Sequence, residues 1–118
     1  MIEEREIERA ARRGCRVIFP ERNQLQLDID TPAQLAAFEA RIEFLRRGEE
    51  CSVEIVPSKS RGHFHVTVTF PHREFGDVER IALQAVLGSD PLREYMAYLR
   101  VLDGWERPCR LFAKAQGV

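Results

Sequence analysis

The chain has 118 residues, of which 44% are hydrophobic and 31% are charged, so we expect one globular domain and not a disordered segment. Its net charge of −1 differs from that of proteins that coat nucleic acid nonspecifically, because such binding depends on neutralising phosphates. No apolar run approaches the length of a membrane span, and the charged residues 1–13 are unlike a signal peptide.

The three cysteines indicate a reducing environment. Cys15, Cys51 and Cys109 are odd in number, widely spaced and without a CxxC pair. This pattern argues against a disulfide framework and against a structural zinc knuckle. We therefore expect a cytoplasmic protein.

The N-terminal half contains the clearest secondary-structure signals. Residues 1–22 are expected to form an extension of one helix, ended by Gly14, and one strand at 15–19. A second strand is expected at 23–30. The helix that follows has Thr31 as its N-cap, Pro32 at its first position and Gln34 completing a capping box.

The C-terminal half predicts two strands, two helices and a last strand. The strands are expected at 51–57 and 63–70, and the last strand at 107–113. A helix near 77–87 should turn Val78, Ile81, Ala82 and Ala85 inward. A further helix should begin after Asp90, a good N-cap, and bury one apolar face. That face comprises Leu92, Tyr95, Met96 and Leu99.

After the extension, the order of elements is strand, helix, strand, strand, helices, strand. This order is typical of the α+β class, and specifically of the RRM-like or ferredoxin-like βαββαβ sheet. We therefore expect residues 1–118 to form a single RRM-like or palm-like domain. Its helices should cover one face of an antiparallel sheet and leave the other face open.

Two acids and two histidines are expected to meet on the open face. Leu25, Leu27 and Ile29 must face the core, which leaves Asp28 and Asp30 on the other face of their strand. By the same alternation, the strand at 63–70 carries His63 and His65 on that face. If the strands are antiparallel neighbours, the aspartates lie next to the histidines.

Carboxylates on alternate residues could hold Mg²⁺ or Mn²⁺, and imidazole could join as a ligand or contact phosphate. Lys59 and Arg61, in the preceding loop, would supply positive charge for phosphates. The alternative is that these are polar residues of a solvated sheet face, with Asp30 placed favourably beside a helix N-terminus.

The same segments resemble the archaeo-eukaryotic primase superfamily, the primase-polymerases. LQLDID resembles its first motif, an acidic pair that holds catalytic metals, here Asp28 and Asp30. SKSRGHFHV is similar to its second motif, which implies that His65 contacts nucleotide phosphates. Further phosphate contacts implied by the resemblance would come from Ser58, Lys59, Ser60, Arg61 and His63.

The resemblance implies an RRM-like catalytic core for nucleotidyl transfer in DNA replication, with nucleoside triphosphates and nucleic acid as partners. The superfamily's third motif is an acid on a late strand. Residues 107–113 contain no acid, so Asp90 is the candidate for this third metal ligand. Because the chain is shorter than a full primase, a larger replication protein is an expected partner.

Two other functions fit parts of the sequence. HFH is similar to the histidine–hydrophobe–histidine motif of rolling-circle nickases, in which both histidines bind metal and a helical tyrosine attacks DNA. Tyr95 or Tyr98 would then be the nucleophile. The third possibility is a non-catalytic RRM-like accessory protein that binds single-stranded nucleic acid.

Overall fold

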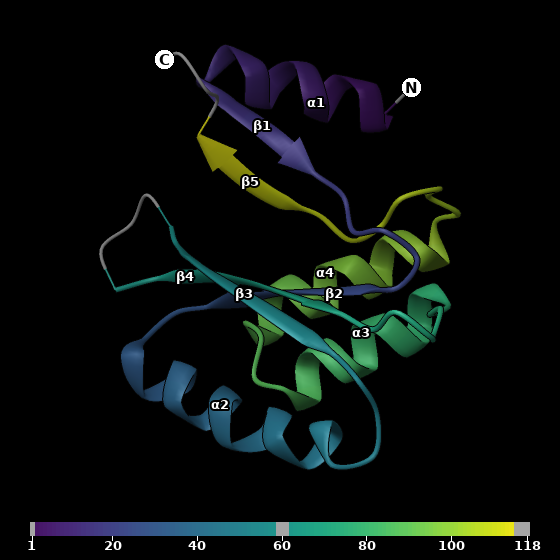
Figure 1. Cartoon of the computed structure of the whole chain (residues 1–118). Helices are drawn as coiled ribbons and strands as arrows, with labels where there is room; N and C mark the ends of the chain where they lie inside the picture. Colours follow the sequence, from purple (N-terminus) through teal and green to yellow (C-terminus); the bar gives the residue numbers. More distant parts are fainter. Residues whose placement is uncertain (1, 59–61, 115–118) are drawn as a thin grey trace.

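A computed structural model describes residues 2–58 and 62–114 of the chain (Figure 1). Each expected helix and strand is present, and the largest displacement is the start of the last strand, which moves from residue 107 to Leu111. The elements are α1 (Ile2–Arg12), β1 (Cys15–Ile18), β2 (Gln24–Ile29), α2 (Pro32–Arg46), β3 (Ser52–Pro57), β4 (Phe64–Thr69), α3 (Asp77–Val86), α4 (Pro91–Leu102) and β5 (Leu111–Lys114).

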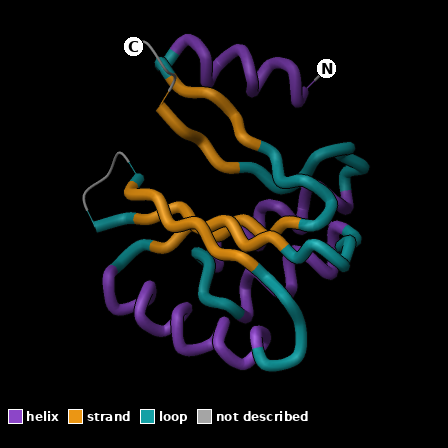
Figure 2. Tube along the Cα trace, viewed as in Figure 1, coloured by secondary structure: helices purple, strands orange, loops and turns teal. Residues whose placement is uncertain are grey.

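The strands form two small antiparallel sheets (Figure 2). The larger sheet has the order β2-β4-β3, so β2 and β4 are antiparallel neighbours, as expected. The smaller sheet pairs β1 with β5. The α+β class is therefore confirmed. The specific βαββαβ topology is not, because the last strand pairs with β1 and not with the larger sheet.

One face of the larger sheet packs on α2 to form the main core. Leu25, Leu27 and Ile29 alternate along β2 and are fully buried against Phe38 and Ile42 of α2. Thr31 caps α2, since its hydroxyl accepts the Gln34 N–H at 3.1 Å. This alternation turns the intervening residues of β2 toward the opposite face.

Side chains of α3 and α4 occupy the outer edge of β2, where a fourth strand would have paired. Arg80 Nε donates to the Gln24 carbonyl at 2.9 Å, and Gln84 Oε1 accepts the Gln26 N–H at 2.8 Å. Arg93 donates to the Gln26 carbonyl, also at 2.9 Å. Since these backbone N–H and C=O groups are already bonded to side chains, they cannot form hydrogen bonds with another strand at this edge of β2.

The two C-terminal helices bury different residues from most of those that the sequence predicts. In α3, the buried residues are Arg80, Ile81 and Gln84, whereas Val78 is 55% exposed. Ala82 and Ala85, also expected inside, are exposed. The prediction is confirmed for Ile81 and was wrong for the other three residues, because it counted apolar residues while the edge of β2 requires polar ones.

The prediction was also wrong for α4, which buries Glu94 and Ala97. Leu92, Tyr95 and Met96 are exposed to solvent instead. The reason is the same: Arg93 bonds to the edge of β2, and Glu94 accepts a hydrogen bond at 2.7 Å from Gln84.

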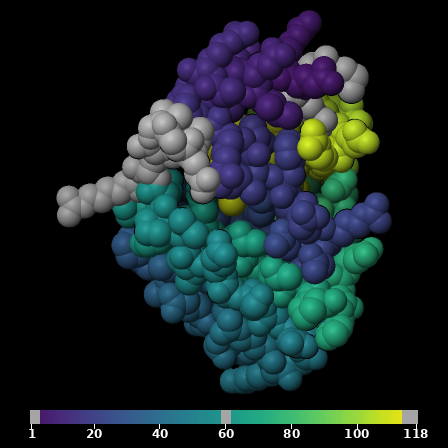
Figure 3. All heavy atoms as spheres, turned by 45° about the horizontal axis from the view of Figure 1, so that its top comes forward, coloured from purple at the N-terminus to yellow at the C-terminus, as the bar shows by residue number. Residues whose placement is uncertain are grey.

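The small sheet covers part of the face that was expected to be open. The first and last described segments lie together in the space-filling view (Figure 3), and Gln26 Nε2 donates to the Ile18 carbonyl at 3.2 Å. Gln26 is consequently 1% exposed. Among the described residues, no helix has the length and apolar character needed to cross a membrane.

Candidate functional site

The end of β2 and the start of β4 bring two acids next to two histidines. Asp28 is the register partner of His65, and the His65 Nε2 lies 3.9 Å from Asp28 Oδ1. The His63 Nδ1 lies 3.4 Å from Asp30 Oδ1. All four side chains remain partly accessible to solvent. The structure therefore places these residues together as the strand alternation predicts.

A third acid, Asp90, joins this pair from the connection between α3 and α4. Its backbone N–H donates to the Asp28 carbonyl at 2.8 Å, and Ser89 Oγ accepts the Asp28 N–H at 3.0 Å. Gly88, at φ 102°, allows the chain to leave α3 and reach the edge of β2. Residues 89–90 thus extend the coverage of that edge and hold Asp90 beside Asp28.

Asp90 also caps α4, since its carboxylate accepts the Leu92 N–H at 3.1 Å. One oxygen each of Asp28, Asp30 and Asp90 lie within 4.8 Å of one another. Among the described residues, this is the one group of three or more acidic, histidine or cysteine side chains arranged in this way. On one octahedral Mg²⁺, neighbouring ligand oxygens are roughly 3.0 Å apart and opposite ones roughly 4.2 Å apart, so the three carboxylates would move closer together to share one ion.

The electrostatics of the group favour a cation. Burial, with added repulsion from Asp30 and Asp90, raises the pKa of Asp28 above its ordinary value, although His65 and Arg93 oppose the shift. Burial and the nearby Arg93 guanidinium lower the pKa of His65, against the attraction of Asp28. A neutral imidazole beside three carboxylates leaves an excess of negative charge, which a divalent cation would neutralise.

A groove of about 330 Å³ begins at these residues. Asp28, His65 and Asp90 line this groove, and Met96 and Phe112 contribute apolar surface to it. Three arginines also line the groove, namely Arg93, Arg100 and Arg110. The groove therefore combines acidic, apolar and basic side chains.

The predicted phosphate-binding loop is only partly described. Ser58 donates its backbone N–H to the His63 carbonyl at 2.9 Å, which closes the β3–β4 hairpin. Lys59, Ser60 and Arg61 lie outside the described residues. Tyr95, which the sequence placed on a buried face, is 58% exposed on α4.

Sequence reasoning missed the residues that support the acids. Ser89 and Arg93 bond to the β2 edge, but serine and arginine have no periodicity that marks such a role. The walls of the groove come from α4 and β5, whose places depended on the unexpected pairing of β5 with β1. The sequence contains no local signal for that pairing.

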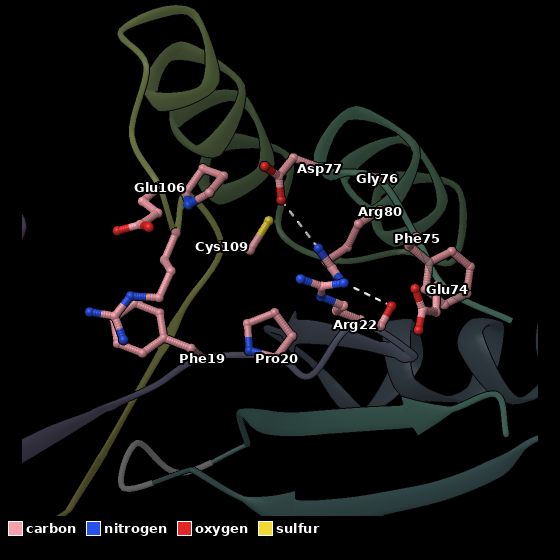
Figure 4. Close-up of a pocket in the computed structure, with 12 residues that line it drawn as sticks. Phe19, Pro20, Arg22, Glu74, Phe75, Gly76, Asp77, Arg80, Glu106 and Cys109 are labelled. Carbon is pink, nitrogen blue, oxygen red and sulfur yellow. Dashed lines mark hydrogen bonds and ion pairs between the residues drawn. The ribbon is translucent and has the colours of Figure 1, made fainter.

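A second cavity, of about 490 Å³, lies between the β1–β2 connection, the start of α3 and residues 106–109 (Figure 4). Its lining includes three arginines and three acids: Arg22, Arg80, Arg107, Glu74, Asp77 and Glu106. Arg80 is bound to Asp77 at 3.3 Å, and Arg107 stacks 3.9 Å from the Phe19 ring centre. Because the arginines and the acids are equal in number, this lining favours neither an anionic nor a cationic ligand.

Cys109 lies in the wall of this cavity, and its reactivity can be predicted. Burial raises the pKa of its thiol to about 11, so about one molecule in a thousand carries a thiolate there at pH 8. In the native protein, iodoacetamide should therefore label the half-buried Cys51 well before Cys109, as measured by peptide mass spectrometry. In denaturant the two should react alike, and equal native rates would contradict the prediction.

Comparison with known proteins adds no relative: no protein-family model, no curated protein and no solved structure matches this chain.

Proposed function

We propose that this chain is a nucleotide-handling protein that carries out metal-dependent nucleotidyl transfer, in the manner of a primase-polymerase core. The observation that carries the proposal is the convergence of Asp90 on Asp28 and Asp30. Two acids on one strand are common on solvated sheets. A third acid comes from a remote connection, which is held to the same strand by the Asp90 N–H and by the Ser89 hydroxyl, and this convergence favours a site.

The three aspartates would hold Mg²⁺ or Mn²⁺, since both ions prefer carboxylate oxygens. When bound, such ions stabilise charge on the attacking and leaving oxygens of a phosphoryl centre. His65, largely neutral because of its lowered pKa, would contact a phosphate oxygen through a ring N–H. His63, beside Asp30, would orient that carboxylate or add a ligand.

The groove supports a nucleotide as the ligand. Its three acidic or histidine side chains suit a metal-bound phosphate, and the three arginines that also line it suit the remaining phosphate charge. Ser58, Lys59, Ser60 and Arg61 remain the predicted triphosphate contacts from the β3–β4 loop. Nucleic acid and a larger replication protein remain the expected macromolecular partners.

The nickase reading has weaker support. It requires both histidines on one metal, whereas His63 and His65 each lie beside a different aspartate. It also gives no role to Asp90. A non-catalytic binding module would likewise leave the third acid unexplained.

Calorimetry with Mn²⁺, and then with a nucleoside triphosphate, tests the proposal. The wild type should bind both, and Asp28→Asn/Asp30→Asn should bind neither. Because the pKa of Asp28 is raised, its charge is unfavourable in the folded state, so Asp28→Asn should be at least as stable as wild type, and urea denaturation checks that the double variant also folds. Retained stability would show that any lost binding is not lost folding.

Two further variants separate the alternatives. Asp103→Asn removes an exposed acid at the end of α4 and should leave Mn²⁺ binding unchanged. Metal binding that survives loss of Asp28 and Asp30 but is abolished by His63→Ala/His65→Ala would favour the nickase. A wild type that binds no metal would reject both enzymatic functions and leave the binding module.

A further inference from the structure

Helix α4 exposes most of its large apolar side chains and turns its charged ones inward. Each of its exposed residues is uncharged, whereas Arg93, Glu94 and Arg100 are buried or half-buried. The exposed large side chains are Leu92, Tyr95, Met96, Tyr98 and Leu102, which are 41% to 66% exposed. A soluble helix normally shows the reverse pattern, so this face indicates a binding surface.

The centre of this face has the spacing of a coiled-coil seam. Leu92, Tyr95, Leu99 and Leu102 follow one another at intervals of three, four and three residues, which places them in one stripe. Met96 and Tyr98 lie on either side of the stripe. We name these six residues the α4 seam. A seam of this kind is completed by another apolar helix.

The α4 seam is self-complementary when two copies are set antiparallel. About a two-fold axis at position 97, Leu92 faces Leu102 of the second copy, and Tyr95 faces Leu99 of it. On one side of the stripe Met96 then lies next to Met96 of the second copy, and on the other side Tyr98 lies next to Tyr98 of it. Each apolar residue therefore meets an apolar partner, as an isologous interface requires.

From this pattern we propose that the chain forms a symmetric homodimer through antiparallel packing of α4 on α4 of a second copy. The seam contains no charge, so two copies meet without repulsion, and it offers no basic group to a nucleic-acid backbone. Phe112 of β5, 45% exposed and lining the same groove as Met96, extends the surface.

The exposed apolar area of the α4 seam is close to that of a small dimer interface. An exposed side chain of this size contributes on the order of 100 Å², so the five exposed seam residues and Phe112 supply roughly 600 Å². Standard interfaces bury about 800 Å² per partner, and the rim around the seam would provide the remainder. The proposal does not depend on the nucleotidyl-transfer function.

Sedimentation equilibrium over micromolar to submillimolar concentrations tests the dimer. The wild type should approach twice the monomer mass, and Leu92→Glu should weaken the dimer about a hundredfold or more, because two unpaired carboxylates would enter the interface. Leu92 is 66% exposed in one chain, so the variant should fold normally, which circular dichroism checks. Phe44→Glu, at an exposed apolar site of α2, is the matched control and should leave the mass unchanged.

The pairing rule allows a rescue. Leu92→Glu/Leu102→Lys should dimerise again, since each introduced carboxylate would face an introduced ammonium of the other copy. On one helix the two positions are about 15 Å apart and cannot pair. A monomeric wild type would overturn the proposal in favour of a different protein partner. A dimer indifferent to Leu92→Glu, a series of larger species, or a failed rescue would overturn the antiparallel arrangement.

Discussion

Replacing Gln84 with alanine is expected to lower the free energy of unfolding by about 3–5 kcal/mol, one of the largest effects of any single polar substitution in this chain. Gln84 is 0% exposed. Its Oε1 accepts the Gln26 N–H at 2.8 Å, and its Nε2 donates to Glu94 Oε1 at 2.7 Å. Alanine would leave the buried Gln26 N–H without its partner, would leave the buried Glu94 carboxylate with Arg93 as its partner, and would add a cavity. Urea denaturation monitored by circular dichroism measures the change.

Gln34→Ala provides the matched control. Gln34 also accepts a backbone N–H, from Asp30 at 3.1 Å, but it is exposed, so water can replace it. Its loss should cost about 1 kcal/mol or less. If Gln84→Ala cost no more than Gln34→Ala, then water would reach the β2 edge, and the account of why β2 lacks a fourth strand would be wrong.

The elements near the site could be predicted because they depend on local patterns. Strict alternation fixed which side chains of β2 and β4 share a face, and Thr31 and Pro32 marked the start of α2. The pairing of Asp28 with His65 followed from these two facts. Local alternation therefore predicted the part of the site that lies within one pair of strands.

The parts that could not be predicted depend on buried polar contacts between distant segments. Arg80, Gln84 and Arg93 would be assigned to solvent by hydrophobicity, yet they bind the edge of β2. Because they occupy that edge, β5 pairs elsewhere, and the apolar residues of α4 are turned outward. The assignment of these buried polar residues to solvent thus led to the wrong strand pairing and to most of the wrong predictions about which residues of α3 and α4 are buried.

Asp90 has one role that a local sequence pattern predicts and one position that depends on contacts between distant segments. Its role as an N-cap was predicted from Pro91 and the apolar residues that follow. Its position beside Asp28 depends on Gly88 and on the backbone bond to β2. A residue with a strong local explanation can therefore also belong to a site, and separating its two roles requires a substitution that keeps one of them.

Asp90→Asn is expected to keep the stability of α4 and to weaken Mn²⁺ binding about thirtyfold. Asparagine caps helices as well as aspartate does, so the acceptance of the Leu92 N–H is retained. The removed charge interacts with a divalent ion by about 2 kcal/mol at 4 Å in water, and this energy corresponds to the thirtyfold change. Calorimetry for binding and urea denaturation for stability measure the two quantities on the same protein.

Asp90→Ala should reduce both quantities, since alanine removes the cap at a cost of about 1 kcal/mol as well as the charge. The pair of variants therefore distinguishes a capping residue from a metal ligand. If Asp90→Asn bound Mn²⁺ as tightly as wild type while Asp28→Asn/Asp30→Asn did not, the site would consist of the β2 acids alone. The approach of Asp90 to Asp28 would then serve only to start α4 against the edge of the sheet, and the main support for nucleotidyl transfer would be lost.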